Sequence, residues 1–168
     1  MRSRGFTLIE LVTVVCVVML LFAVALDRLM RYQEMGERAA LEQNLAAMNS
    51  ALVLKFAAYV AMGRPQDIAN EVGQNPINLL SRPPENYLGD LYAPDIGTLP
   101  RATWYFDRAP RELVYLPHRS RYLTSRAGPP DTLRFRIVLT EVEQRPNAPR
   151  ELPQPFVGPT QPFKWLID

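Results

Sequence analysis

Few residues in this chain are of types that carry chemistry, and they are scattered along it. Glu10 is the one carboxylate in the otherwise uncharged stretch 6–26. Cys16 is the only cysteine, so the chain cannot form an internal disulfide, and His118 is the only histidine. The sequence has no glycine-rich phosphate loop, no paired Cys/His ligand set and no nucleophile motif. We therefore expect no catalytic residue, no metal, no cofactor and no enzymatic activity.

Three oxygen-bearing side chains in the middle of the sequence, Asn86, Asp90 and Asp95, are of the kind that binds calcium. Their spacing matches no defined calcium loop, and solvated turn residues are the simpler interpretation. We accordingly predict a turn over residues 86–90 and leave calcium binding open.

The longest feature of the sequence is the apolar run that contains Glu10. Its 21 residues, 6–26, form a helix long enough to cross the hydrocarbon core of a bilayer. Arg2 and Arg4 precede the run and favour a cytoplasmic N-terminus. A carboxylate inside such a span costs about 2.5–3.5 kcal/mol on insertion scales, which makes Glu10 a functional candidate.

Residues 5–12, Gly-Phe-Thr-Leu-Ile-Glu-Leu-Val, resemble the N-terminus of type IV pilins and type II secretion pseudopilins. Four features coincide: a short basic leader, a Gly-Phe junction, a glutamate at the fifth position after it, and an unbroken apolar run. The resemblance implies that a prepilin peptidase cuts between Gly5 and Phe6 and that the new N-terminal Phe6 is N-methylated. It also implies that Glu10 is the glutamate that this family uses in assembly.

The chemistry of Glu10 agrees with that role. Cleavage would create a positive amine on Phe6, four residues before Glu10, and the carboxylate could pair with this amine or with that of a neighbouring subunit. Pairing would remove two charged groups from lipid and set the axial register of adjacent helices. The alternative is that Glu10 reaches the headgroup layer by itself.

The resemblance implies a structural subunit of a type II secretion pseudopilus or a type IV pilus. Such a protein is stored in the inner membrane as a single-pass protein with a cytoplasmic N-terminus and a periplasmic C-terminal domain. Its partners would be other pilin or pseudopilin subunits, prepilin peptidase, an inner-membrane assembly platform and the lipid bilayer. The missing disulfide and the proline-rich tail favour a pseudopilin or minor subunit over a major pilin.

Three alternatives stay open. The chain could be a minor pilin that binds DNA or another ligand, or a membrane-anchored module outside any filament. The apolar run could also be a signal peptide, cleaved after the residues 23–25.

We expect an α+β fold, a pilin-like roll in which a long N-terminal helix packs on a small antiparallel sheet. The divisions that we predict are the leader 1–5, the transmembrane and assembly helix 6–26, its amphipathic continuation 27–63, a variable connection 64–101, the antiparallel sheet 102–145 and a proline-rich tail 146–168.

The continuation of the helix has a clear pattern. No proline occurs between residues 6 and 64, and Gly63 and Pro65 supply a stop. Asp27 leaves open whether the helix melts there. An apolar stripe at helical period should bury against the sheet; its members are Leu41, Leu45, Met48, Leu52, Phe56 and Tyr59.

The C-terminal half carries the strand signals. Residues 103–106 and 112–116 predict a hairpin, 121–124 a short strand, and 132–142 an alternating strand with one apolar face. Together they predict a sheet of three or four strands. A short helix is possible at 67–72.

Charge and proline content bear on partners. Residues 101–136 carry eight arginines, which is why nucleic acid is an alternative partner, although loss of the two leader arginines would leave the chain formally neutral. The tail's prolines predict an extended, polyproline-like path with little backbone pairing, and its apolar end 163–168 should dock on the domain.

Overall fold

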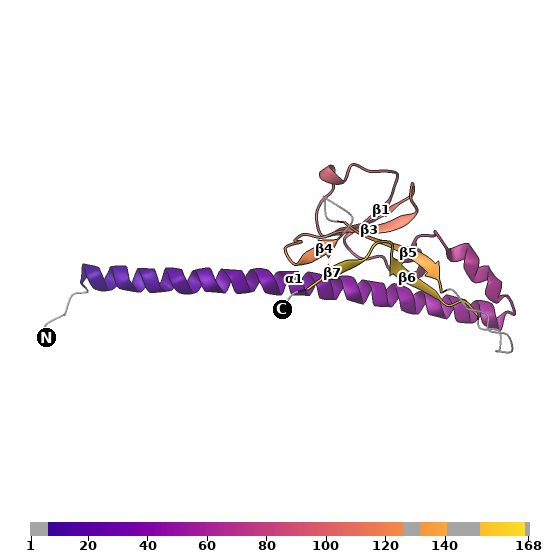
Figure 1. Ribbon diagram of the computed structural model, residues 1–168, viewed down its shortest axis with the longest axis horizontal. Coiled ribbons are helices and arrows are strands. Elements are labelled where there is room, and N and C mark those ends of the chain that lie inside the picture. Colours follow the sequence, from indigo (N-terminus) through magenta and orange to yellow (C-terminus); the bar gives the residue numbers. More distant parts are fainter. Residues whose placement is uncertain (1–6, 126–131, 141–151, 167–168) are drawn as a thin grey trace.

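A single long helix carries a β-rich headpiece along one half of its length (Figure 1). The structure is a computed structural model and describes residues 7–125, 132–140 and 152–166. The helix, α1, spans Leu8–Ala61, which is roughly 80 Å at the usual α-helical rise. It passes Asp27 without a break, and Asp27 pairs with Arg31 one turn later at 2.9 Å. The predicted continuous helix is confirmed.

Both ends of α1 follow from local sequence. Thr7 begins the helix because its hydroxyl accepts a hydrogen bond from the backbone N–H of Glu10 at 3.3 Å. Gly63 ends it by adopting the left-handed conformation, with φ +72°, that glycine tolerates best. The next element then opens on Pro65, as the sequence predicts.

The headpiece comprises residues 65–125, 132–140 and 152–166. Its elements are the 3-10 helices η1 (Pro65–Glu71), η2 (Pro76–Leu79) and η3 (Ile96–Thr98), and the strands β1 (Tyr87–Leu91), β2 (Thr103–Asp107), β3 (Glu112–Leu116), β4 (Leu123–Ser125), β5 (Leu133–Leu139), β6 (Pro155–Pro159) and β7 (Phe163–Trp165). Five strands form a sheet in the order β1-β2-β3-β5-β6, and β4 pairs with β7 separately. The α+β layout is confirmed, with the short helix at 65–71, the hairpin and the two later strands where they were expected. The expected number of three or four strands is wrong, because β1 and β6 add a strand at each edge of the sheet.

The core lies between the helix stripe and the sheet. Leu41, Met48 and Leu52 are at most 3% exposed, and the other members of the predicted stripe pack partly buried against the same cluster. The sheet contributes the apolar face of β5, namely Leu133, Phe135 and Ile137, together with Trp104 of β2. The predicted helix stripe and strand face are therefore confirmed as the two sides of one core.

The turn predicted over residues 86–90 is wrong. Residues 87–91 form β1, which pairs with β2 in parallel and makes the sheet mixed. The register shifts between Tyr87 and Asp90, and Gly89 lies there at φ +99°, a bulge-like irregularity. The turn-forming residues thus sit inside an irregular edge strand, where pairing with β2 outweighs local propensity.

The prediction that the tail has little backbone pairing is also wrong for residues 152–166. β6 pairs with β5, and β7 pairs with β4. The N–H of Thr160 donates to Arg134 of β5, whereas the N–H of Val157 points to α1. Since backbone direction alternates, Pro155 and Pro159 share the outward direction of Val157 and cost the β5–β6 ladder no hydrogen bond. The expected docking of the apolar end on the domain is confirmed for residues 163–166.

Candidate assembly surface

The N-terminal half of α1 is bare, in the sense that no other described part of the chain covers its apolar side chains. Its large apolar side chains from Leu8 onward are exposed, Leu8 itself at 81% and Phe22 still at 63%. Among the described residues, α1 is the one helix long and apolar enough to cross a membrane, and none of its most apolar window is buried. Figure 1 shows this half extending beyond the headpiece. Because a bare apolar surface of this size is unstable in water, lipid or other apolar helices must cover it.

Glu10 lies in the first turn of α1 and is exposed. The partial positive charge of a helix N-terminus favours a carboxylate at this position. Gly5 and Phe6, the residues of the predicted cleavage and methylation, lie outside the described residues. Cys16 lies on the same bare segment and is exposed.

The other candidate residues do not converge. Asp90 accepts hydrogen bonds from Asn75 and Tyr87, whereas Asp95 caps η3 through Gly97 and Asn86 donates to a backbone carbonyl. The backbone N–H of His118 donates a hydrogen bond to the carboxylate of Glu37 on α1. Within the described ranges no group of three metal-ligating side chains occurs. The oxygen-bearing side chains thus serve separate turns and strands.

Two glutamates of α1 fasten the headpiece to the helix, and sequence reasoning missed them. The carboxylate of Glu34, only 2% exposed, accepts hydrogen bonds from the Trp165 indole N–H at 2.9 Å and the Tyr122 backbone N–H at 3.1 Å. Glu37 accepts from the Tyr115 hydroxyl at 2.8 Å. Burial, together with this bond, raises the pKa of Tyr115. Glu37 lies one turn and Glu34 two turns before Leu41, on the face of the apolar stripe, but this position alone does not separate them from solvated helix residues.

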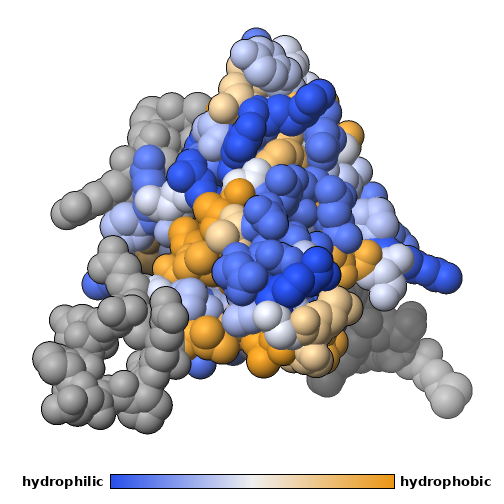
Figure 2. Space-filling view, turned by 90° about the vertical axis from the view of Figure 1, so that its right-hand side faces the viewer, coloured by the Kyte–Doolittle hydropathy of each residue, from blue (hydrophilic) through white to orange (hydrophobic). Residues whose placement is uncertain are grey.

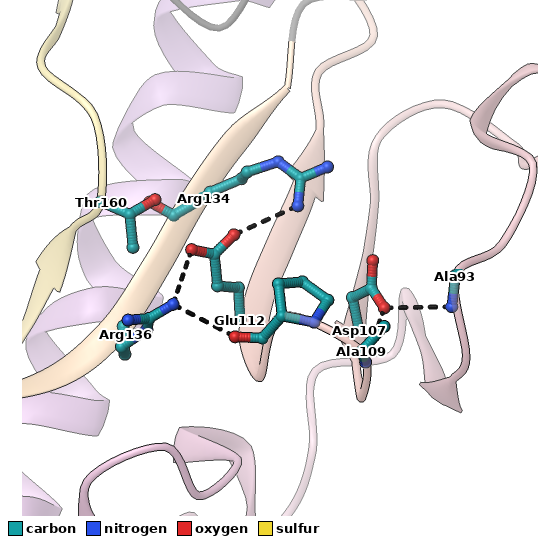
Figure 3. A network of polar contacts seen from close by, with 8 residues as sticks. Ala93, Asp107, Ala109, Glu112, Arg134, Arg136 and Thr160 are labelled. Carbon is teal, nitrogen blue, oxygen red and sulfur yellow. Dashed lines mark hydrogen bonds and ion pairs between the residues drawn. The ribbon is translucent and has the colours of Figure 1, made fainter.

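A third acid, Glu112, pairs with both arginines of β5. Figure 3 shows its carboxylate between Arg134, at 3.2 Å, and Arg136, at 3.1 Å. Arg136 also donates to the carbonyl of Pro110. These two arginines of the predicted basic sheet are therefore engaged inside the headpiece, which weakens the argument for nucleic acid.

The opposite end of the molecule differs from the bare half of α1. Viewed from the C-terminal end of α1, the headpiece shows mostly hydrophilic surface with smaller hydrophobic areas between (Figure 2). Among the described residues, the longest run of exposed apolar side chains lies on residues 8–26, and Leu29, Met30 and Met35 continue it along α1.

Comparison with known proteins supports the family resemblance. The chain is 36% identical over 75 residues to the type IV major pilin protein PilA of Myxococcus xanthus (strain DK1622). That match spans 45% of this chain and 33% of the length of the relative. No family profile matches the chain, and no solved structure does. The similarity to a type IV pilin, together with the long apolar N-terminal helix, confirms the resemblance to the pilin family that residues 5–12 indicate.

Proposed function

We propose that this chain is a pilin-like structural subunit of a type IV pilus or a type II secretion pseudopilus. The observation that carries the proposal is a bare apolar half-helix with one carboxylate in its first turn. The similarity to a type IV major pilin supports it. In this function the residues 6–26 hold the chain in the inner membrane first and pack against other subunits later.

How the subunits assemble would depend on which interactions can hold apolar helices together once they leave lipid. Apolar helices gain little from the hydrophobic effect when they leave lipid for one another, so close packing and polar pairs must hold them. After prepilin peptidase cuts between Gly5 and Phe6, Glu10 pairs with the methylated amine of Phe6 on a neighbouring subunit. An inner-membrane assembly platform would draw the subunit into the filament, with the headpiece on the periplasmic side.

The first test is cross-linking in native membranes, followed by mass spectrometry of the N-terminus and of the cross-linked neighbours. We expect a chain that begins at methylated Phe6 and neighbours that are other pilin-like proteins. Those neighbours would distinguish a pilus from a secretion pseudopilus.

An intact leader without such neighbours would contradict the proposal. The chain would then be a membrane-anchored module outside any filament. A start after Ala25 would instead identify the apolar run as a secretory signal and remove the membrane anchor altogether.

A further inference from the structure

Basic side chains gather where the bare half of α1 meets the headpiece. Arg28 and Arg31 follow the apolar run on α1, and Arg119 and Arg121 lie on the connection between β3 and β4. One member of each pair approaches Asp27, whose carboxylate is 2.9 Å from a guanidinium nitrogen of Arg31 and 3.8 Å from one of Arg121. We call these four arginines the arginine collar.

The collar keeps an excess of positive charge toward solvent. The side chains of Arg31 and Arg121 are 48% and 69% exposed, and Arg28 is exposed as well. Among the described residues, Asp27 and Glu34 are the acids that line the groove of about 230 Å³ between α1 and the β3–β4 connection. Glu34 is buried and binds two N–H groups, so the four guanidinium groups are matched by two carboxylates, of which Asp27 is the one that pairs with arginine.

The position of the arginine collar along α1 determines its depth in a membrane. If residues 6–26 fill the hydrocarbon core, Arg28 and Arg31 stand about 3 and 8 Å beyond its edge at the α-helical rise. The headgroup layer occupies roughly that interval on each side of a bilayer. Tyr32, 64% exposed, lies at the same level, and tyrosine is enriched at this interface.

We propose that the arginine collar binds the phosphate groups of anionic phospholipids in the leaflet on the headpiece side. The proposal rests on the membrane-embedded state of the proposed function. Guanidinium groups bind phosphate oxygens in a bidentate manner, and three of them, those of Arg31, Arg119 and Arg121, line one groove here. Bound lipid would hold the headpiece against the membrane surface until the subunit leaves for the filament.

A lipid occupant is favoured over a second copy of the chain because the collar follows directly on the apolar run. At that level an isolated subunit in a bilayer is surrounded by headgroups.

The test uses the full chain, one copy per lipid nanodisc of phosphatidylcholine with a minor fraction of spin-labelled phosphatidylglycerol. Electron paramagnetic resonance reports the association of each lipid with the protein. We expect the wild-type chain to prefer phosphatidylglycerol. Because a basic residue near an anionic surface contributes about a factor of five in affinity, Arg28→Gln/Arg121→Gln should reduce the preference at least fivefold or abolish it.

The matched control is Arg108→Gln/Arg111→Gln, which removes the same charge. Both residues are exposed in the β2–β3 turn, and Arg111 lies beside Gly73, just after η1 and so toward the far end of the headpiece from the apolar run. The control should retain the wild-type preference, and circular dichroism should show that both double variants are folded.

Four results would overturn the inference. They are no preference in the wild type, an equal loss in both double variants, displacement of the lipid by inorganic phosphate, and a preference that appears only when each disc holds two copies. A chain that alkaline extraction releases from the bilayer would instead contradict the proposed function, and the inference with it, so the two failures are distinguishable.

Discussion

The contact between Glu34 and the end of the headpiece gives the sharpest prediction for stability. Glu34 is buried on α1, and its carboxylate is the acceptor for the indole N–H of Trp165 on β7 and the backbone N–H of Tyr122 next to β4. These bonds join the two-stranded β4–β7 sheet to the helix. Replacing Glu34 with alanine removes the acceptor for two donors at once.

The magnitude follows from the number and kind of bonds. A hydrogen bond to a charged group contributes about 1.5–3 kcal/mol, and leaving a buried donor without a partner costs about 1–3 kcal/mol. We expect Glu34→Ala to lower the free energy of unfolding by about 3–5 kcal/mol. Glu34→Gln keeps a neutral acceptor, and since neutral bonds are about half as strong, its loss should be only about 1–2 kcal/mol.

The assay is urea unfolding of the full chain in a mild nonionic detergent, followed by tryptophan fluorescence. Hydrogen exchange should show faster exchange first in residues 122–124 and 163–165. Glu85→Ala serves as the control, because Glu85 is exposed and the loss of an exposed side chain away from such contacts changes the free energy of unfolding by less than about 0.5 kcal/mol. An alanine variant as stable as the wild type, or a glutamine variant as unstable as the alanine one, would refute this account.

Three further predictions concern other contacts. Asn49→Asp keeps the acceptor for the Val157 N–H but loses the amide donor to the carbonyls of Leu45 and Val157. Urea unfolding should therefore show a loss of about 1–3 kcal/mol, with Asn49→Ala at least as costly. The pKa values of Tyr115 and Tyr87 are raised by burial, so the folded state keeps protons that the unfolded state loses above about pH 10, and stability should fall there by up to about 1.4 kcal/mol per pH unit for each tyrosine. Denaturation at pH 10–12 should show a shallower slope in the Tyr115→Phe variant; an unchanged slope would assign the loss elsewhere. Glu10→Ala should leave N-terminal processing intact but abolish incorporation into filaments, and normal incorporation would exclude a register role.

The helix and its stripe could be predicted because their signals are local. An uninterrupted proline-free run, a glycine stop and a four-three spacing of apolar residues each depend on neighbours within a few turns. The hairpin at residues 103–116 and the alternation in β5 are equally local. Glu10 stood out for the same reason, as the one charge in an apolar run.

What the sequence did not reveal depends on distant partners. β1 contains Gly89 and Asp90, which favour a turn, and becomes a strand only because β2 lies beside it. The prolines of the tail predict that it forms no strand, unless their spacing is taken into account. Pro155 and Pro159 are four residues apart and so point the same way, which is the pattern that an edge strand accepts.

The polar contacts between α1 and the headpiece also could not be predicted from the sequence. Glu34 and Glu37 could not be told from solvated helix residues, because their partners lie far along the chain. Burial of a carboxylate is visible only once those partners are placed.

The pairing of β6 and β7 has a consequence for how the protein is made. Trp165 is joined to Glu34 across 131 residues of sequence, and β6 is the strand that lies against α1. The headpiece cannot close its core while the ribosome is still short of residue 165, because an edge strand and the helix contact are both missing. Folding of the headpiece must then wait until residue 165 has been synthesised, so products truncated before it would remain open and sensitive to proteases.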